Sequence, residues 1–252
     1  MDVDQHLASL EADGDLLARA AARAGLEASV PSCPGWQVRH LLRHVGYVHR
    51  WAAAHVAQAS PELLEGPSEE EVLRRGPGDD ELLAWFQEGH VGLVKTLRSA
   101  DPALSCWTFL DAPSPLAFWA RRQAHETAIH RADAQAASGP VTPFEPTFAA
   151  DGIDELLVGF APRERVAATI TERYVLAVRS LDTSDEWLVT LDPESIEAHR
   201  GTGPGNSVVA GMGSDLYLTL WNRCPADDAR LSISGDPQGL ILWRAIMQVG
   251  WN

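Results

Sequence analysis

The sequence has few cysteines and no long apolar run. Its 252 residues include three cysteines that form no CxxC pair, Cys33, Cys106 and Cys224. This argues against a zinc ribbon or a disulfide framework and fits a reducing compartment, so each is expected to be a small buried hydrophobe. No basic segment followed by an apolar one opens the chain, and no stretch of about 18 apolar residues occurs in it. We therefore expect a cytoplasmic protein with no signal peptide and no membrane span.

Positive charge is also scarce. The chain has 20 Lys and Arg against 35 Asp and Glu, a formal net charge of -15. A nucleic-acid backbone or an anionic membrane would repel such a chain, so neither is expected as a partner. A small molecule or a second copy is expected instead, and the chain should be a monomer or a homodimer. Its length suits one large domain or two small ones, and we favour two.

The first half of the chain has the three-four apolar spacing that is typical of helices packed on a common core. This spacing predicts four helices, near residues 7–24, 38–59, 83–97 and 118–137. The connection at 60–80 is rich in Pro, Gly and acidic residues and has room for one short helix. Four helices with long connections predict a four-helix bundle, in which facing side chains can build an interior site.

The second half has a different pattern. Three prolines and a glycine in SGPVTPFEP predict a domain boundary near 140–146, giving domains 1–142 and 143–252. Short β-prone segments predict strands at 173–182, 186–192, 195–201, 206–211 and 230–236. Two helices are expected, at 213–223 with Ser214 as its N-cap and at 237–248 opening with Pro237. The second domain should therefore be a smaller α+β domain with a mostly antiparallel sheet.

One stripe of the helix at 118–137 becomes polar along its length, and it includes Glu126 and His130. Residues four apart on a helix lie about 40° apart round its axis, so these two side chains can share one ligand. His125 lies about 140° from His130 and is a weaker candidate. On the second helix, His44 lies at the edge of the apolar stripe. Two imidazoles and a carboxylate from facing helices form a three-ligand site with an open position, as in catalytic zinc sites, although Ni²⁺ or Fe²⁺ would also accept them.

The alternative is that this helix buries another face. A second stripe consists of small residues that allow close packing, Ala117, Ala120, Ala124 and Ala128. If that face is inside, Glu126 and His130 are solvated, and periodicity alone favours this arrangement. Asp133 and Gln123 could orient the ligands if the site exists, and a part for His40 is left open. Structural roles are expected for His90 in the core and for the turn at Pro34, Gly35 and Trp36. Trp119 is expected to be a core aromatic, with lining of the pocket as the alternative. Pairing with the acidic surface is expected for Arg121, Arg122 and Arg131, with contact to an anionic substrate as the alternative.

Three stretches together resemble a known family. They are VPSCPGWQVRHLLRHVGYVHRWA, WARRQAHETAIHRADA, and GSDLYLTLW with ISGDPQGLILWR. In this order they are similar to the mycothiol-dependent maleylpyruvate isomerase family of actinobacteria, whose N-terminal half is a DinB-like helical bundle. The resemblance covers essentially the whole chain. It implies that His44, Glu126 and His130 bind a divalent metal, usually zinc, and that Arg223 helps to engage the substrate or the thiol.

The resemblance also implies a reaction. A metal that binds the sulfur of mycothiol keeps it deprotonated, and the thiolate is then a nucleophile at neutral pH. Addition to the cis double bond of maleylpyruvate, rotation and elimination would give the trans isomer, whereas other electrophiles would make the protein a thiol S-transferase. Two alternatives stay open: a hydrolase in which the metal activates water, and a small-molecule-binding member without catalysis.

Overall fold

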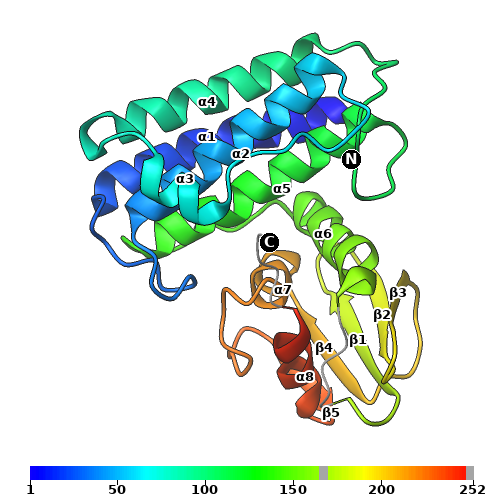
Figure 1. Cartoon of the computed structure of the whole chain (residues 1–252). Helices are drawn as coiled ribbons and strands as arrows, with labels where there is room; N and C mark the ends of the chain where they lie inside the picture. The colour runs from blue at the N-terminus through cyan, green and yellow to red at the C-terminus, as the bar shows by residue number, and fades with distance from the viewer. Residues whose placement is uncertain (165–169, 248–252) are drawn as a thin grey trace. The chain divides into compact units, whose positions relative to one another are not determined.

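The computed structural model describes residues 1–164 and 170–247 (Figure 1). The chain divides into two compact units, the first being Met1–Thr142 and the second beginning at Pro143. Within the described residues, every helix is too short or too polar to cross a bilayer.

The first unit is a four-helix bundle, as predicted. Its long helices are α1 (Val3–Ala24), α2 (Val38–Gln58), α4 (Asp79–Ser99) and α5 (Pro115–Ala136). Both α1 and α2 pack against α4 and against α5, which closes the bundle. The short helix α3 (Glu69–Arg75) lies in the polar connection before α4 and packs on α2. Fully buried apolar side chains from three of the long helices fill one end of the core, Leu17, Leu41, Val45, Leu82 and Phe86.

Capping residues stabilise the N-termini of α1 and α5, the first and last long helices of this unit. At α1, Asp2 accepts a hydrogen bond from the backbone N–H of Gln5, whose side chain in turn accepts from the backbone N–H of Asp2. At α5, the Ser114 hydroxyl accepts from the backbone N–H of Ala117, and Pro115 occupies the first helical position. Such caps satisfy N–H groups that have no partner within the helix, and proline at this position loses nothing.

The expectation that α5 buries only one of two faces is wrong. The alanine stripe is inside, since Ala120, Ala124 and Ala128 are fully buried. The polar stripe is also largely inside, with Gln123 1% and His130 9% exposed. Both outcomes hold together because α1 and α2 each pack on α5 and cover different sides of it. Burial of the alanine face therefore does not leave the polar face in water.

The second unit is an α+β unit with a five-stranded sheet. Its strands are β1 (Tyr174–Ser180), β2 (Glu186–Leu191), β3 (Ile196–Arg200), β4 (Ser207–Gly211) and β5 (Ser232–Gly235). They are ordered β3-β2-β1-β4-β5, and every neighbouring pair is antiparallel except β1 with β4. The mostly antiparallel sheet is confirmed. β1 and β2 form an antiparallel hairpin. β4 pairs with the other edge of β1 and runs in the same direction as β1, so this pair is parallel.

Helices flank this sheet. They are α6 (Pro146–Asp154), continued by η1 (Glu155–Phe160) and η2 (Ala161–Arg163), then α7 (Gly213–Leu220) and α8 (Gln238–Ile246), of which α8 packs on β1 and β4. The helical segment from Pro146 to Arg163 is not predicted by the sequence pattern. Ser214 is not the N-cap of α7, because the helix begins one residue earlier and the Ser214 hydroxyl accepts from the backbone N–H of Phe144. Residue 248, the expected end of the last helix, lies outside the described residues.

Candidate metal centre

His44, Glu126 and His130 lie together inside the bundle. Nε2 of His44, from α2, is 3.2 Å from Oε1 of Glu126, and Nε2 of His130, one turn further along α5, is 3.3 Å from the same oxygen. The candidate ligand atoms of all three residues lie within 4.8 Å of one another. The two rings are 5.0 Å apart at an angle of 75°. Burial is nearly complete for His44, at 5% exposed, so the three donors converge away from bulk water.

Charges within this cluster stabilise each other. Burial acts to raise the pKa of Glu126, but hydrogen bonds from His130 and His44 and the nearby charge of Arg122 hold that pKa well below its usual range. Burial acts to lower the pKa of His130, but hydrogen bonds to Asp133 and Glu126 and their charges raise it to about 9. Glu126 is therefore an anion, whereas His130 carries a proton on each ring nitrogen, and a metal ion would have to displace the proton that lies between Nε2 of His130 and Glu126.

Two further charged residues surround the cluster. Oδ2 of the fully buried Asp133 is 2.8 Å from Nδ1 of His130. A carboxylate only accepts hydrogen bonds, so Nδ1–H is the donor and Nε2 is the nitrogen turned towards Glu126. Nη2 of Arg122 is 3.3 Å from the second oxygen of Glu126. Asp133 thus orients one imidazole, and Arg122 holds the side of the carboxylate that faces away from the histidines.

Arginines expected on the surface are buried instead. Arg122 is 4% exposed and pairs with Glu126, and Arg131 is 2% exposed and donates from Nε to Asp13 over 3.0 Å. The prediction that they pair with the acidic surface is wrong for both. Each has its carboxylate partner inside the bundle, because α5 is covered on both sides and a buried guanidinium needs such a partner.

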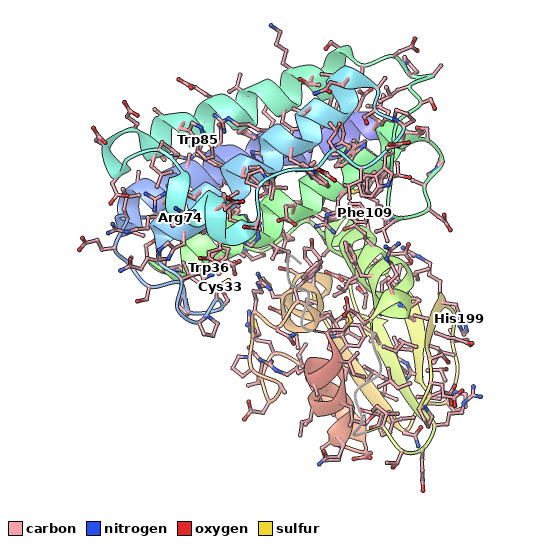
Figure 2. The ribbon with its side chains drawn as sticks, viewed as in Figure 1. Cys33, Trp36, Arg74, Trp85, Phe109 and His199 are labelled. Carbon is pink, nitrogen blue, oxygen red and sulfur yellow. The ribbon has the colours of Figure 1, made fainter. Side chains whose placement is uncertain are left out.

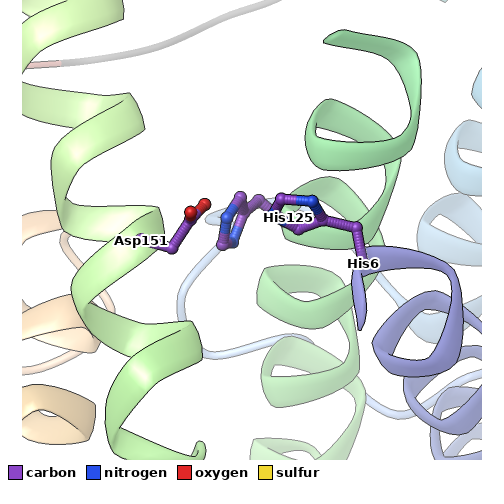
Figure 3. A group of neighbouring side chains, drawn as sticks. All are labelled: His6, His125 and Asp151. Atoms are coloured by element: carbon purple, nitrogen blue, oxygen red, sulfur yellow. The ribbon is translucent and has the colours of Figure 1, made fainter. Parts of the chain in front are cut away.

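The remaining candidates are placed elsewhere or act differently. His40 accepts a hydrogen bond at Nδ1 from the backbone N–H of Gln37 and so caps the start of α2. His125 lies beside His6 of α1, with ring centroids 5.9 Å apart (Figure 3). His90 is a buried structural histidine, as predicted, bonded to the backbone oxygen of Leu10. Arg223 belongs to the second unit, where its Nη1 donates to the backbone oxygen of Trp221.

Two residues near the site were missed as site residues. Ser32 Oγ is 2.5 Å from Oδ1 of Asp133, and the ring of Trp36 lies edge-on to His44 with 5.2 Å between centroids. Both belong to the loop before α2. The only sequence signal for them was the turn sequence PSCPGW next to the helix that carries His44, and it was interpreted as a fixed entry to that helix.

Comparisons with known proteins agree over both units. The family model of the mycothiol maleylpyruvate isomerase N-terminal domain matches residues 7–135, and the model of the C-terminal domain of the same family matches residues 147–240. A crystal structure of the mycothiol-dependent maleylpyruvate isomerase aligns with a TM-score of 0.67 at 14% identity, covering 93% of each chain. A histidine-to-alanine variant of that enzyme aligns equally well, with the same score and identity. No curated protein sequence matches.

Proposed function

The chain belongs to the mycothiol-dependent maleylpyruvate isomerase family, and from that premise we propose a metal-dependent isomerase that uses mycothiol as its nucleophile. The observation that carries the proposal is the convergence of His44, Glu126 and His130 inside the bundle. The family model supports it because its match spans α2 and α5, the two helices that bear these residues. The two units would then be a metal-binding bundle, 1–142, and the family's C-terminal domain, 143–252.

The chemistry of the donor set fits a divalent metal. Zinc accepts imidazole nitrogen and carboxylate oxygen, and three protein ligands leave one position for a small molecule. Because Nδ1–H of His130 is held by Asp133, Nε2 is the nitrogen that would bind a cation, after losing the proton that it shares with Glu126. Glu126 is already ionised and supplies negative charge at the centre of the group. Ni²⁺ and Fe²⁺ accept the same donors, so the residues fit a class of ions rather than one ion.

When bound, the metal would supply a deprotonated thiol at neutral pH. That thiol would supply the nucleophile for reversible addition to the cis double bond of a maleylpyruvate-like acid, which would allow rotation about this bond and give the trans isomer when the thiol is released again. The protein would hold the ligands, with Asp133 orienting His130 and Arg122 fixing Glu126, while Arg223 would help to engage the anionic substrate or the thiol.

Isomerisation measured with and without mycothiol tests this proposal. We expect the zinc-loaded protein to convert maleylpyruvate to its trans isomer only when mycothiol is present. His44→Ala should lose the bound metal and the activity together. Thiol-independent hydrolysis of an ester or amide by the same zinc-loaded protein would favour the hydrolase alternative. Metal and mycothiol binding without any turnover would favour a non-catalytic member of the family.

A further inference from the structure

Asp133 is held at both oxygens by side chains that lie far apart in the sequence. Oδ2 accepts from Nδ1 of His130 at 2.8 Å, and Oδ1 accepts from the Ser32 hydroxyl at 2.5 Å. The carboxylate is completely buried. Burying a carboxylate costs free energy unless hydrogen bonds stabilise it, so each of these bonds helps to hold the Asp133 side chain in place. The sulfur of Cys33 also lies 3.8 Å from Oδ2, but a thiol is a weak donor.

The loop that carries Ser32 is closed on itself. The backbone N–H of Val30 donates to the carbonyl oxygen of Trp36 over 2.9 Å. The N–H of Trp36 donates to the oxygen of Cys33 over 2.9 Å, and the N–H of Cys33 donates to the oxygen of Val30 over 3.1 Å. Gly35 has a φ of 84°, a left-handed conformation that favours glycine. These bonds fix the loop from Val30 to Trp36 as a compact turn before α2, where Figure 2 labels Cys33 and Trp36. A fixed turn can position a hydroxyl accurately.

This loop reaches the surroundings of both candidate histidine ligands. Trp36 lies edge-on to His44, with ring centroids 5.2 Å apart at 63°. Ser32 reaches His130 through Asp133. A carboxylate bonded at only one oxygen can pivot about that bond, whereas one held at both oxygens has a fixed plane. The hydroxyl of Ser32 therefore helps to fix the plane of the carboxylate and the position of Oδ2, and Oδ2 helps to set the direction of the His130 ring.

We propose that Ser32 is a positioning residue for the metal centre, acting through Asp133 to aim Nε2 of His130 at the cation. The inference rests on the proposed function, because it assumes that His130 is a metal ligand. It assigns distinct parts to two adjacent residues. Ser32 fixes the position of the Asp133 carboxylate through a short hydrogen bond from its hydroxyl. The thiol of Cys33 makes only a weak contact and does not contribute to this positioning.

Cobalt titration of the full-length protein tests the assignment, with visible absorption reporting both affinity and ligand geometry. Replacing groups that orient a metal-bound histidine typically weakens metal binding by about 10- to 100-fold. We expect Ser32→Ala to bind cobalt about tenfold more weakly and to show a changed absorption band. Ser32→Thr, which keeps a hydroxyl, should restore both readings. Cys33→Ala should bind cobalt like the unchanged protein.

Each outcome separates this inference from the proposed function. If the unchanged protein binds no cobalt, the proposed function fails first. If it binds cobalt and Ser32→Ala has the same affinity and the same band, Ser32 positions nothing and the inference is wrong. Equal losses in Ser32→Thr and Cys33→Ala would also overturn it, because they would indicate general damage to the loop. Should Ser32→Ala not fold, Ser32→Cys replaces it and is expected to bind more weakly than Ser32→Thr.

Discussion

Helices α2 and α5 contribute to two clusters of buried histidines that differ in what the ring nitrogens meet. In the paired cluster, consisting of His44, Glu126, His130 and Asp133, the nitrogens face carboxylates. In the neutral cluster, consisting of His49, Phe86, His90 and Thr127, they face uncharged groups: Nε2 of His49 meets the Thr127 hydroxyl at 2.8 Å and Nε2 of His90 meets a backbone oxygen. His44 and His49 are only five residues apart on one helix.

Burial has opposite outcomes in the two clusters. In the paired cluster, Asp133 and Glu126 outweigh burial and raise the pKa of His130 to about 9. In the neutral cluster, burial dominates and holds the pKa of His49 well below 6.5, and the nearby His90 lowers it further. The partner groups, rather than the depth of burial, therefore decide whether a histidine in this bundle carries charge. In the paired cluster, the carboxylates therefore offset the cost of burying a positive charge.

Removing the carboxylate of Glu126 from the paired cluster should have the largest effect, a loss of metal affinity. Glu126→Gln keeps the size of the side chain but removes the negative charge that both imidazoles share. We expect metal affinity to fall by at least about 100-fold, beyond the range typical for residues that only orient ligands. A zinc competition titration with a chromogenic chelator measures the loss.

The adjacent residue provides the control for Glu126→Gln. In Thr127→Val the new side chain has nearly the same shape as threonine but lacks the hydroxyl that is bonded to His49. It should keep the metal affinity and lower the stability of the protein by about 1–3 kcal/mol, because a buried ring nitrogen loses its partner. Unchanged zinc affinity in Glu126→Gln, or loss of zinc in Thr127→Val, would contradict the division into two clusters.

Packing of the neutral cluster depends on a glycine of α1. A Cβ added at Gly14 would lie 2.2 Å from Nε2 of His90. We expect Gly14→Ala to lower stability by about 1–3 kcal/mol, because a crowded core outweighs the better helix propensity of alanine. Urea unfolding measures the change.

Gly92 of α4 is the matched position for this comparison. It is exposed, and an added Cβ there meets nothing within 4 Å. Gly92→Ala should therefore stabilise the protein by up to about 1 kcal/mol. If both alanine variants shift the urea midpoint in the same direction, the close approach of His90 to α1 does not govern the packing of the cluster.

Mild acid should destabilise the protein through the neutral cluster. The folded-state pKa values of His49 and His90 lie below the ordinary value of 6.5, mainly because of burial. Below pH 6.5 the unfolded chain therefore binds protons that the folded chain does not, so stability is present above pH 6.5 and falls as the pH drops. The slope approaches about 1.4 kcal/mol per pH unit for each such histidine.

Melting curves between pH 7 and 5.5 measure this slope above the range in which ordinary carboxylates titrate. His49→Gln can still bond to Thr127 but does not titrate. Its melting temperature should change less over this range than that of the unchanged protein. An identical pH profile for the two proteins would mean that His49 takes up a proton in the folded state, and the contrast between the clusters would fail.

Spacing along the sequence predicted the parts of this picture that lie within one element. The three-four pattern predicted all four long helices, and the four-residue step from Glu126 to His130 placed both on one side of α5. His44 was proposed as a candidate ligand from its position at the edge of an apolar stripe and from the family resemblance, and the structure places it beside Glu126. These are local properties of a helix, which periodicity describes directly.

Contacts between distant segments could not be predicted in the same way. Asp133 meets Ser32, 101 residues earlier, and no spacing rule connects a loop to a helix over that distance. Apolar periodicity identifies a single buried face of a helix, so it could not predict that α5 is buried on both its alanine face and its polar face. The pairing of Arg131 with Asp13 of α1 was missed for the same reason. Such pairings depend on which helices become neighbours, and that is settled by the packing of the whole bundle.

The smallest predicted effect concerns Gln123, one turn before Glu126 on α5. The side chain is 1% exposed, and its Oε1 has no hydrogen-bond partner among the described residues. A buried amide oxygen without a partner is destabilising, and an apolar side chain of similar shape avoids the cost of removing that oxygen from water. Gln123→Met should therefore raise stability by about 1 kcal/mol in urea unfolding, with zinc affinity unchanged. A less stable Gln123→Met protein would indicate that this amide is hydrogen-bonded in solution, and the environment beside the paired cluster would then be more polar than its side chains imply.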